Sequence, residues 1–455
     1  MKKRVLSLLM TGAMLASLLV GCGSTSTAET AATETPAATS AAAEATSEAP
    51  AAAATSAAAE ASTSDISGDL NIIHYLTETA KLQALDDLVA GFEAEYPNVK
   101  VNVEAQSMDN YQDMVKLRIS NGDVPDIIFG GPKTYSDLVS SGNIADLTNE
   151  EFTSRVASGM LDNVKVDGKV YGIPLDAMAN VVFYNKDIFE KVGLEIPKTY
   201  NDFFDCCKKL KAAGYDACVA GYQDNIALGA NIYTIYFGAP YLEDENYATE
   251  LMSGTKKASE IAGLTKAMTQ WREIMQYQND DRKKVTTDVA EQYFASGKSG
   301  MIIIGTWGLG AIMNYNPQGN FGGFVYPSED SEEKNAMPLA TDDTWMLAAD
   351  SKNPAAAKAF LEYATRSDVN AKWCGTTSQL SAIDGVQVTS LPQAAQDIAN
   401  LTTTATISNW ISKATFYGQY DKSWYKCLQD FALDDNMTID QFDENLDNEF
   451  AAANK

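Results

Sequence analysis

Few residues of this chain are arranged for catalysis. The sequence contains a single histidine, His74, and it follows the apolar pair Ile72-Ile73, which favours a place in the core or in a cleft wall. Catalysis of the Ser-His-Asp or Cys-His kind could use only that residue, and no G-x-S-x-G motif accompanies it. Gly297-Lys298-Ser299 resembles the end of a phosphate-binding loop, but Gln292 stands where such a loop needs glycine. The pattern argues against most enzymes, although 61 acidic residues leave a glycosidase carboxylate pair open.

The distinctive side chains instead follow the ends of predicted strands, where α/β sheets bind ligands. Aromatic faces pack on the C–H face of a sugar ring, while carboxylates and amides bind its hydroxyls, so these residues favour a sugar-binding cleft. Asp342 and Asp343 precede Trp345, and we take Asp343 as the candidate contact. The other candidates at strand ends are Tyr75, Thr77, Glu78, Gly130, Lys133 and Trp307.

Alternating strand and helix patterns position these residues. Strands are expected at 70–75, 99–103 and 126–129, and helices at 82–96, 111–120 and 135–140, which predicts an α/β fold with parallel strand pairs. Further along, the patterns predict strands at 181–184, 217–220, 301–304 and 345–348, a helix at 202–213 and a mainly helical stretch at 225–297. A helix opens at Asn353-Pro354, with Asn353 as cap and Pro354 at the first helical position. Helices are also expected at 424–433 and at 438–453, where Thr438 and Gln441 form a capping box.

The N-terminus reads as an export signal. Lys2, Lys3 and Arg4 precede an apolar stretch at 5–20, which is too short for a membrane span. The stretch ends in Leu19-Val20-Gly21-Cys22, which looks like a bacterial lipobox. We therefore expect a signal peptide at 1–21, an acylated Cys22, and attachment to the outer face of the cytoplasmic membrane.

Residues 22–68 consist almost wholly of Ala, Thr, Ser and Glu, and they lack Lys, Arg and aromatic residues. Such a segment buries too little apolar surface to order itself, so we expect a disordered tether. The formal charge of −27 becomes −30 once Lys2, Lys3 and Arg4 are removed, which argues against nucleic acid as a partner. The five remaining cysteines form no C-x-x-C motif, and we expect buried free thiols.

One segment carries the clearest resemblance. Residues 167–204 read DGKVYGIPLDAMANVVFYNKDIFEKVGLEIPKTYNDFF, with a turn at Asp167-Gly168 and a helix start at Thr199 and Asp202. Together with the motifs GDVPDI at 122–127, GMIIIGTW at 300–307 and SKNPAAA at 351–357, this segment resembles the family 1 extracellular solute-binding proteins. These are the sugar-capturing subunits of ABC importers and are related to maltose-binding protein.

The resemblance implies a two-lobed, periplasmic-binding-protein-like fold with a ligand cleft between the lobes. Lobe 1 is expected at 69–177 plus 343–388, and lobe 2 at 178–342 plus 389–455. It also implies a monomer that closes by a hinge near the crossings between lobes and delivers its ligand to a separate permease and ATPase. No catalytic residue, cofactor or metal is implied.

The same resemblance assigns roles to individual residues. Trp307 and Trp424 resemble residues that stack on sugar, and Asp176 either binds ligand or braces a crossing. Tyr222 and Asp224 lie in a ligand loop of lobe 2. Because aromatic residues are mostly packing residues, Trp345, Trp410 and Trp424 are either ligand platforms or part of a core. Gly130 departs from the family pattern, because relatives such as maltose-binding protein carry Trp there. A surface glycan-degrading lipoprotein, or a binding protein for another solute such as a polyol or peptide, stays open as an alternative.

Overall fold

The computed structural model describes residues 65–411, 416 and 418–454. The predicted signal peptide, Cys22 and the predicted tether as far as residue 64 lie outside the described residues. None of the helices in the described part is long and apolar enough to cross a membrane.

The first sheet has five strands in the order β2-β1-β3-β12-β6. β1 runs parallel to both β2 and β3, as the alternating pattern predicts, whereas β12 runs antiparallel to β3 and β6. The strands are β1 (Gly68–His74), β2 (Val99–Ala105), β3 (Ile127–Phe129), β6 (Ile173–Pro174) and β12 (Thr344–Leu347).

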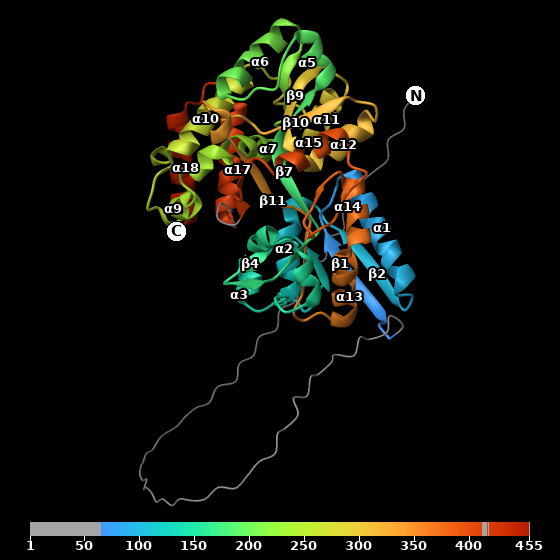
Figure 1. The fold of residues 1–455 in the computed structure, drawn as a ribbon. Helices are drawn as coiled ribbons and strands as arrows, with labels where there is room; N and C mark the ends of the chain where they lie inside the picture. Colours follow the sequence, from blue (N-terminus) through green and yellow to red (C-terminus); the bar gives the residue numbers. More distant parts are fainter. Residues whose placement is uncertain (1–64, 412–415, 417, 455) are drawn as a thin grey trace, which may run out of the picture. The chain divides into compact units, whose positions relative to one another are not determined.

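Helices from two distant parts of the chain pack around this sheet. Figure 1 shows α1 and α13 beside β1 and β2. The helix α13 begins at Pro354, and the Asn353 side chain accepts a hydrogen bond from the Ala356 N–H, which confirms the predicted cap. The helices of this part are α1 (Thr79–Glu95), α2 (Met108–Ser120), α3 (Ser136–Ser140), α4 (Ser158–Leu161), α13 (Pro354–Ala364) and α14 (Ser367–Thr377), with 3-10 turns at Glu151–Arg155 and Asp162–Val164.

The second sheet is built on one long strand, β7 (Asp176–Asn185). The predicted strand at 181–184 is the middle of β7, which pairs antiparallel with β9 and β11 on its two sides. Their side chains are almost all buried on both faces. The order is β14-β11-β7-β9-β8, and β10 and β13 also pair with β7. The other strands are β8 (Asp216–Val219), β9 (Ser299–Gly305), β10 (Phe321–Phe324), β11 (Ala336–Thr341), β13 (Leu380–Ser381) and β14 (Thr406–Ser408).

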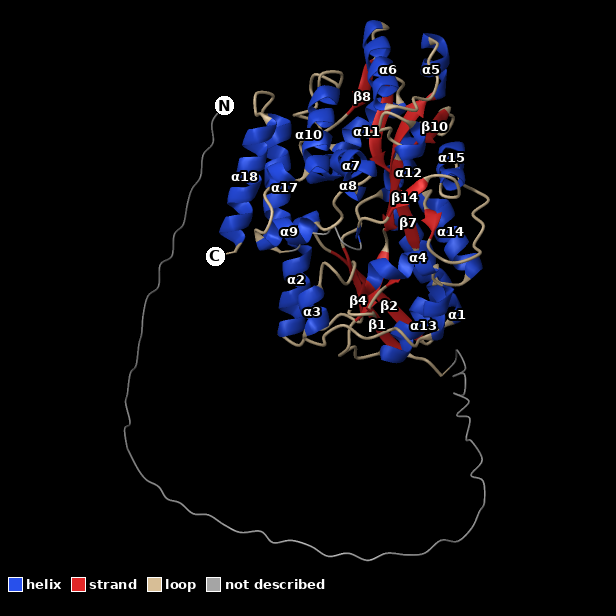
Figure 2. Ribbon diagram, turned by 60° about the vertical axis from the view of Figure 1, so that its left-hand side comes forward, coloured by secondary structure: helices blue, strands red, loops and turns tan. Residues whose placement is uncertain are grey.

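Most helices of the described residues lie in the part of the chain that contains the second sheet. Figure 2 shows α17 and α18 side by side, with α10 and α7 nearby. The capping boxes predicted at Thr199–Asp202 and Thr438–Gln441 are both formed. The helices are α5 (Lys186–Val192), α6 (Tyr200–Ala212), α7 (Asn225–Tyr236), α8 (Ala239–Leu242), α9 (Tyr247–Ser253), α10 (Ala262–Met275), α11 (Thr287–Ala295), α12 (Leu309–Tyr315), α15 (Gln393–Leu401), α17 (Gln419–Leu433) and α18 (Ile439–Ala453), with 3-10 turns at Ala258–Glu260, Thr306–Gly308 and Glu332–Lys334.

A short hairpin precedes β7. Its strands β4 (Lys165–Val166) and β5 (Lys169–Val170) are joined by Asp167 and Gly168, which have φ angles of 49° and 79°. Positive φ at both central residues is the conformation of a tight hairpin turn, which explains the Asp-Gly pair.

Each sheet has its own buried core. The core of the first sheet draws its side chains from 70–175 and 345–383, and that of the second sheet from 177–340 and 391–450. Cys206, Cys207, Cys218, Cys374 and Cys427 are buried free thiols, as predicted. The lobe boundaries expected at 342/343 and 388/389 fall between these stretches, the one expected at 177/178 lies one residue inside the second core, and all three stay a prediction.

Candidate functional site

A cavity of about 310 Å³ is lined by residues from elements of both sheets. Its volume lies at the lower end of the range of about 300–1,000 Å³ that is common for small-molecule sites. The lining residues that come from the first sheet and from its helices and loops are Tyr75, Met108, Gln112, Gly131, Lys133, Thr134, Asn163 and Thr344. Those from the second sheet's part are Met178, Tyr233, Phe237, Thr341, Asp342, Trp410, Ile411, Phe416, Asp421 and Trp424.

Aromatic rings form one wall of this cavity. Phe237 and Trp410 stack with centroids 4.6 Å apart and planes at 15°, and Tyr233 stacks on Phe237 at 5.0 Å. Tyr233 lies one helical turn before Phe237, which brings both rings to the same face of α7. Phe416 and Trp424 add a second ring pair at 5.2 Å. Phe237, Trp410, Phe416 and Trp424 are at most 5% exposed and pack mainly on one another, so each gives the cavity a small apolar surface, of the kind that packs on the C–H face of a sugar ring.

Asp421, in the first turn of α17, places a carboxylate in the same cavity. Burial raises its pKa to about 6, and Lys422 opposes this shift. No hydrogen bond or ion pair to the side-chain carboxylate of Asp421 is found among the described residues. This carboxylate can therefore accept hydrogen bonds from ligand hydroxyls.

Lys133 and Tyr75 come from the loops that follow β3 and β1. Burial lowers the pKa of Lys133 to about 8, while Asp162 acts in the opposite direction. The Tyr75 ring is fixed by edge-on contacts with Tyr111 at 4.8 Å and Phe129 at 4.9 Å. Burial raises the pKa of Tyr75, so its hydroxyl stays a neutral donor and acceptor.

Asp342 brings a second carboxylate to the cavity wall. Its Oδ2 accepts hydrogen bonds from Lys81 Nζ and from Gln379 Nε2, each at 2.7 Å. Lys81 Nζ also donates to Asp343 Oδ1 at 2.8 Å, and the Asp343 N–H donates to Asp176 Oδ1 at 2.8 Å. We call Lys81, Asp176, Asp342, Asp343 and Gln379 the Lys81 cluster.

The charges of the Lys81 cluster shift one another. Burial alone lowers the pKa of Lys81, but Asp342 and Asp343 outweigh it and hold that pKa well above its usual value. Burial, together with the neighbouring carboxylates, raises the pKa of Asp176 and of Asp343. Oxygens of Asp176, Asp342 and Asp343 lie within 4.8 Å of one another, a spacing that could hold a metal ion, yet Lys81 already supplies a positive charge there.

Comparison with known proteins identifies the class of molecule. The model of the bacterial extracellular solute-binding protein family matches residues 77–371. The chain belongs to this family. A relative in Streptococcus mutans, named multiple sugar-binding protein, is 24% identical over 324 residues, which is 69% of this chain and 76% of the relative. The maltodextrin-binding protein of Bacillus subtilis is 26% identical over 304 residues, or 65% of this chain and 68% of the relative.

Solved structures share the fold. A chitin oligosaccharide binding protein superposes with a TM-score of 0.73 at 18% identity, covering 85% of this chain and 99% of the other. The apo form of RafE from Streptococcus pneumoniae gives a TM-score of 0.68 at 23% identity, covering 85% and 98%. The expected α/β, two-lobed solute-binding-protein fold is therefore confirmed.

In this solute-binding protein, three of the predicted contacts line the cavity, namely Tyr75, Lys133 and Trp424. Gly130 lies next to the lining residue Gly131 and has a φ of 131°. A Cβ at Gly130 would stand 2.9 Å from the Tyr135 ring. Backbone conformation and this close approach both require glycine, so no stacking side chain can project from position 130.

Other predicted contacts serve the fold. Tyr222 has no exposed surface, and its hydroxyl is engaged by Trp271 Nε1 at 2.9 Å and by Gln278 Nε2 at 2.8 Å. Trp345 is likewise fully buried and packs edge-on against Phe129 in the core of the first sheet. Neither side chain lines the cavity, and both are held by core contacts in place of the predicted contact with ligand.

Asp224, Asp176 and Asp343 are also held by protein groups. Asp224 caps α7 through the N–H groups of Ile226 and Ala227, and it binds Thr287 as well. Asp176 accepts the Trp373 indole N–H at 2.8 Å and thus braces the start of β7, which is the alternative that the sequence left open. Asp343 is fully buried, and its neighbour Asp342 is the carboxylate at the cavity.

Thr77, Glu78 and Trp307 lie outside the cavity lining. Thr77 is exposed, and its N–H donates to the Glu78 side chain at 3.0 Å. Trp307 is half-buried and packs against the second sheet's core. Their predicted contact with ligand stays a prediction.

Five contributors were missed or left undecided by the sequence: Tyr233, Phe237, Trp410, Asp342 and Asp421. A weak signal for the first two was the four-residue spacing of aromatic residues on a predicted helix. No local pattern signals that Trp410 and Asp421 meet them, because the contact depends on tertiary packing.

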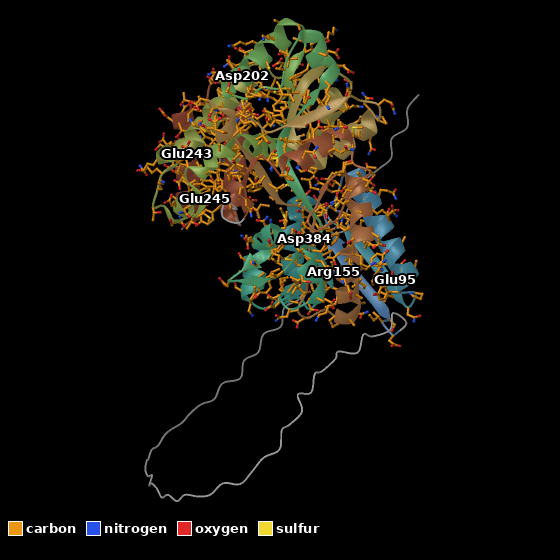
Figure 3. The ribbon with its side chains drawn as sticks, viewed as in Figure 1. Glu95, Arg155, Asp202, Glu243, Glu245 and Asp384 are labelled. Carbon is orange, nitrogen blue, oxygen red and sulfur yellow. The ribbon has the colours of Figure 1, made fainter. Side chains whose placement is uncertain are left out.

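Two other hollows have different chemistry. One of them, of about 820 Å³, lies along α18 and is lined by Asp440, Asp443, Glu444 and Asp447 with one aromatic residue, Phe450. Another, of about 360 Å³, is lined by Arg155 and Asp384, which are labelled in Figure 3. The Arg155 guanidinium is already paired with Glu362 at 3.2 Å. Neither combines an aromatic platform with uncommitted polar groups.

Proposed function

We propose that this solute-binding protein captures a carbohydrate, with an oligosaccharide as the ligand, in the cavity between the aromatic wall and the polar groups of Tyr75, Lys133, Asp342 and Asp421. The observation that carries the proposal is the stacked pair Phe237–Trp410 beside two carboxylates in one cavity. Stacking rings and hydroxyl-binding carboxylates are what a pyranose needs. The names of several relatives, which refer to multiple sugars and to maltodextrin, support the same class.

We further propose that the protein works as a lipid-anchored monomer. Cys22 carries the lipid, the tether gives reach, and the lobes close on the ligand by a hinge where the chain passes between the two sheets. Closure follows only if the ligand binds the closed form more tightly than the open form. The closed form then docks on a membrane permease that is driven by a separate ATPase.

A glycan panel tests the ligand class. The mature protein is screened by thermal shift with raffinose, stachyose, maltotetraose, xylotetraose and chitotetraose, and with polyols and short peptides as the competing class. Stabilisation by at least one oligosaccharide is expected, because a ligand that binds only the folded state raises the melting temperature. Stabilisation by peptides or polyols alone would overturn the carbohydrate assignment.

The same samples separate binding from hydrolysis. After overnight incubation, thin-layer chromatography is expected to show each glycan intact. New, shorter fragments would instead favour a glycan-degrading lipoprotein.

A further inference from the structure

The Lys81 cluster lies at two connections through which the chain passes between the two sheets, β6 to β7 and β11 to β12. Asp176 is the first residue of β7, directly after β6 of the other sheet. Asp342 and Asp343 lie between β11 and β12, and Gln379 lies between α14 and β13. One group of hydrogen-bonded side chains therefore joins these two connections and the segment before β13.

Lys81 is the centre of this group. Its side chain projects from α1 and is only 5% exposed, and its ammonium reaches Asp342 and Asp343 at 2.7 and 2.8 Å. Gln379 extends the contacts, because its Oε1 accepts a hydrogen bond from Thr306 Oγ1 at 2.7 Å while its Nε2 donates to Asp342. A buried ammonium with two carboxylate partners is fixed in place far more firmly than an exposed one.

The consequence for the cavity lies in Asp342. Both donors, Lys81 and Gln379, bind the same oxygen, Oδ2. The described residues provide no donor for Oδ1, and the side chain of Asp342 is 20% exposed where it lines the cavity. One oxygen is thus clamped by the protein, and the other is left for a ligand.

We propose that Lys81 is a positioning residue of the ligand site, which clamps Oδ2 of Asp342 so that Oδ1 faces the cavity and accepts hydrogen bonds from ligand hydroxyls. This inference rests on the proposed function. Lys81 contacts no ligand itself, and it acts on affinity only through Asp342.

The test must separate this role from simple charge balance. Replacing Lys81 alone leaves buried carboxylates without a counter-charge, which can unfold a protein. The background is therefore Asp343→Asn, which removes one buried carboxylate and keeps an acceptor for Lys81. In this background, Lys81→Met, Asp342→Ala and their combination are made, and affinity for the tightest glycan of the panel is measured by isothermal titration. Melting temperatures establish that each variant is folded.

The affinity of Asp343→Asn alone, measured in the same way, is the reference for this series. In that background, Lys81→Met and Asp342→Ala should each weaken binding at least tenfold. The combined variant should bind with the same affinity as whichever of the two single variants binds more weakly. Lys372→Met, which removes an exposed lysine of α14, is the control and should bind as wild type does.

Two results would overturn the inference while leaving the proposed function intact. One is an unchanged affinity of the folded Lys81→Met variant. The other is a combined variant whose loss is the product of the two single losses, since independent effects multiply. If the wild type binds no glycan of the panel, the proposed function fails, and this inference fails with it.

Discussion

Trp410 lies flat against Phe237, with ring centroids 4.6 Å apart and planes at 15°, and both rings line the cavity. The contact joins α7 to a residue more than 170 positions later in the chain. The two stacked rings together form one apolar surface of the cavity wall.

The first prediction compares two tryptophans. Trp410→Ala should weaken glycan binding at least tenfold, because the substitution removes both the aromatic ring that packs on the sugar and part of the cavity wall. The sequence favoured Trp307 as a stacking residue, but it lies outside the cavity lining, so Trp307→Ala should weaken binding by less than threefold if this cavity is the site. Affinities come from intrinsic fluorescence titration, with circular dichroism to establish folding. The reverse order would move the site to Trp307.

The second prediction concerns pH. Burial raises the pKa of Asp421 to about 6, so its ionised form is disfavoured in the free protein, and its contribution to stability falls as pH rises from about 4 to 6. Ligand hydroxyls that donate to the carboxylate favour the ionised form. Affinity should therefore rise with pH up to about 6 and then level off, so that binding at pH 5 is roughly tenfold weaker than at pH 7.

Asp421→Asn provides the control for this prediction. Its affinity should be weaker than that of the wild type at pH 7 but nearly constant between pH 5 and 7, as isothermal titration would show. A wild-type affinity that does not change over this range would exclude Asp421 as a ligand contact.

The third prediction removes the cavity ammonium. Lys133→Met keeps the length of the side chain but loses a charged donor, and hydrogen bonds to charged groups contribute about 1.5–3 kcal/mol. Binding should weaken roughly tenfold or more. Lys165→Met, at a partly exposed lysine paired with Asp162, is the matched control. Equal affinities of the two variants would remove Lys133 from the site.

The fourth prediction addresses the fold. Thr199 accepts the Asp202 N–H at 3.2 Å, and the Asp202 side chain accepts the Thr199 N–H at 3.1 Å. Thr199→Ala should lower the free energy of unfolding by about 1 kcal/mol, measured by urea denaturation. Thr199→Ser keeps the hydroxyl and should cost much less. A larger loss for serine than for alanine would contradict the capping account.

The fold was largely predictable because its signals are local. The capping boxes at Thr199 and Thr438 and the turn at Asp167-Gly168 each depend on neighbouring residues, and all three are formed. Short strands such as β6 and β13 escaped prediction, since two residues carry no periodicity.

The site was less predictable, because it depends on distant contacts. The strand-end rule led correctly to Tyr75 and Lys133, which lie in the cavity. It failed for Trp345, because one residue of difference along a strand turns a side chain from one face of the sheet to the other. It also led to Asp343, whereas its neighbour Asp342 lines the cavity, because Asp343 is fully buried and Asp342 is 20% exposed.

A crystal structure of the protein with the tightest glycan of the panel tests the proposed sugar site most directly. We expect a sugar ring on the face of the Phe237–Trp410 pair, with hydroxyls within about 3 Å of the carboxylates of Asp342 and Asp421. A glycan bound against Trp307, with no contact to Trp410 or Asp342, would contradict it.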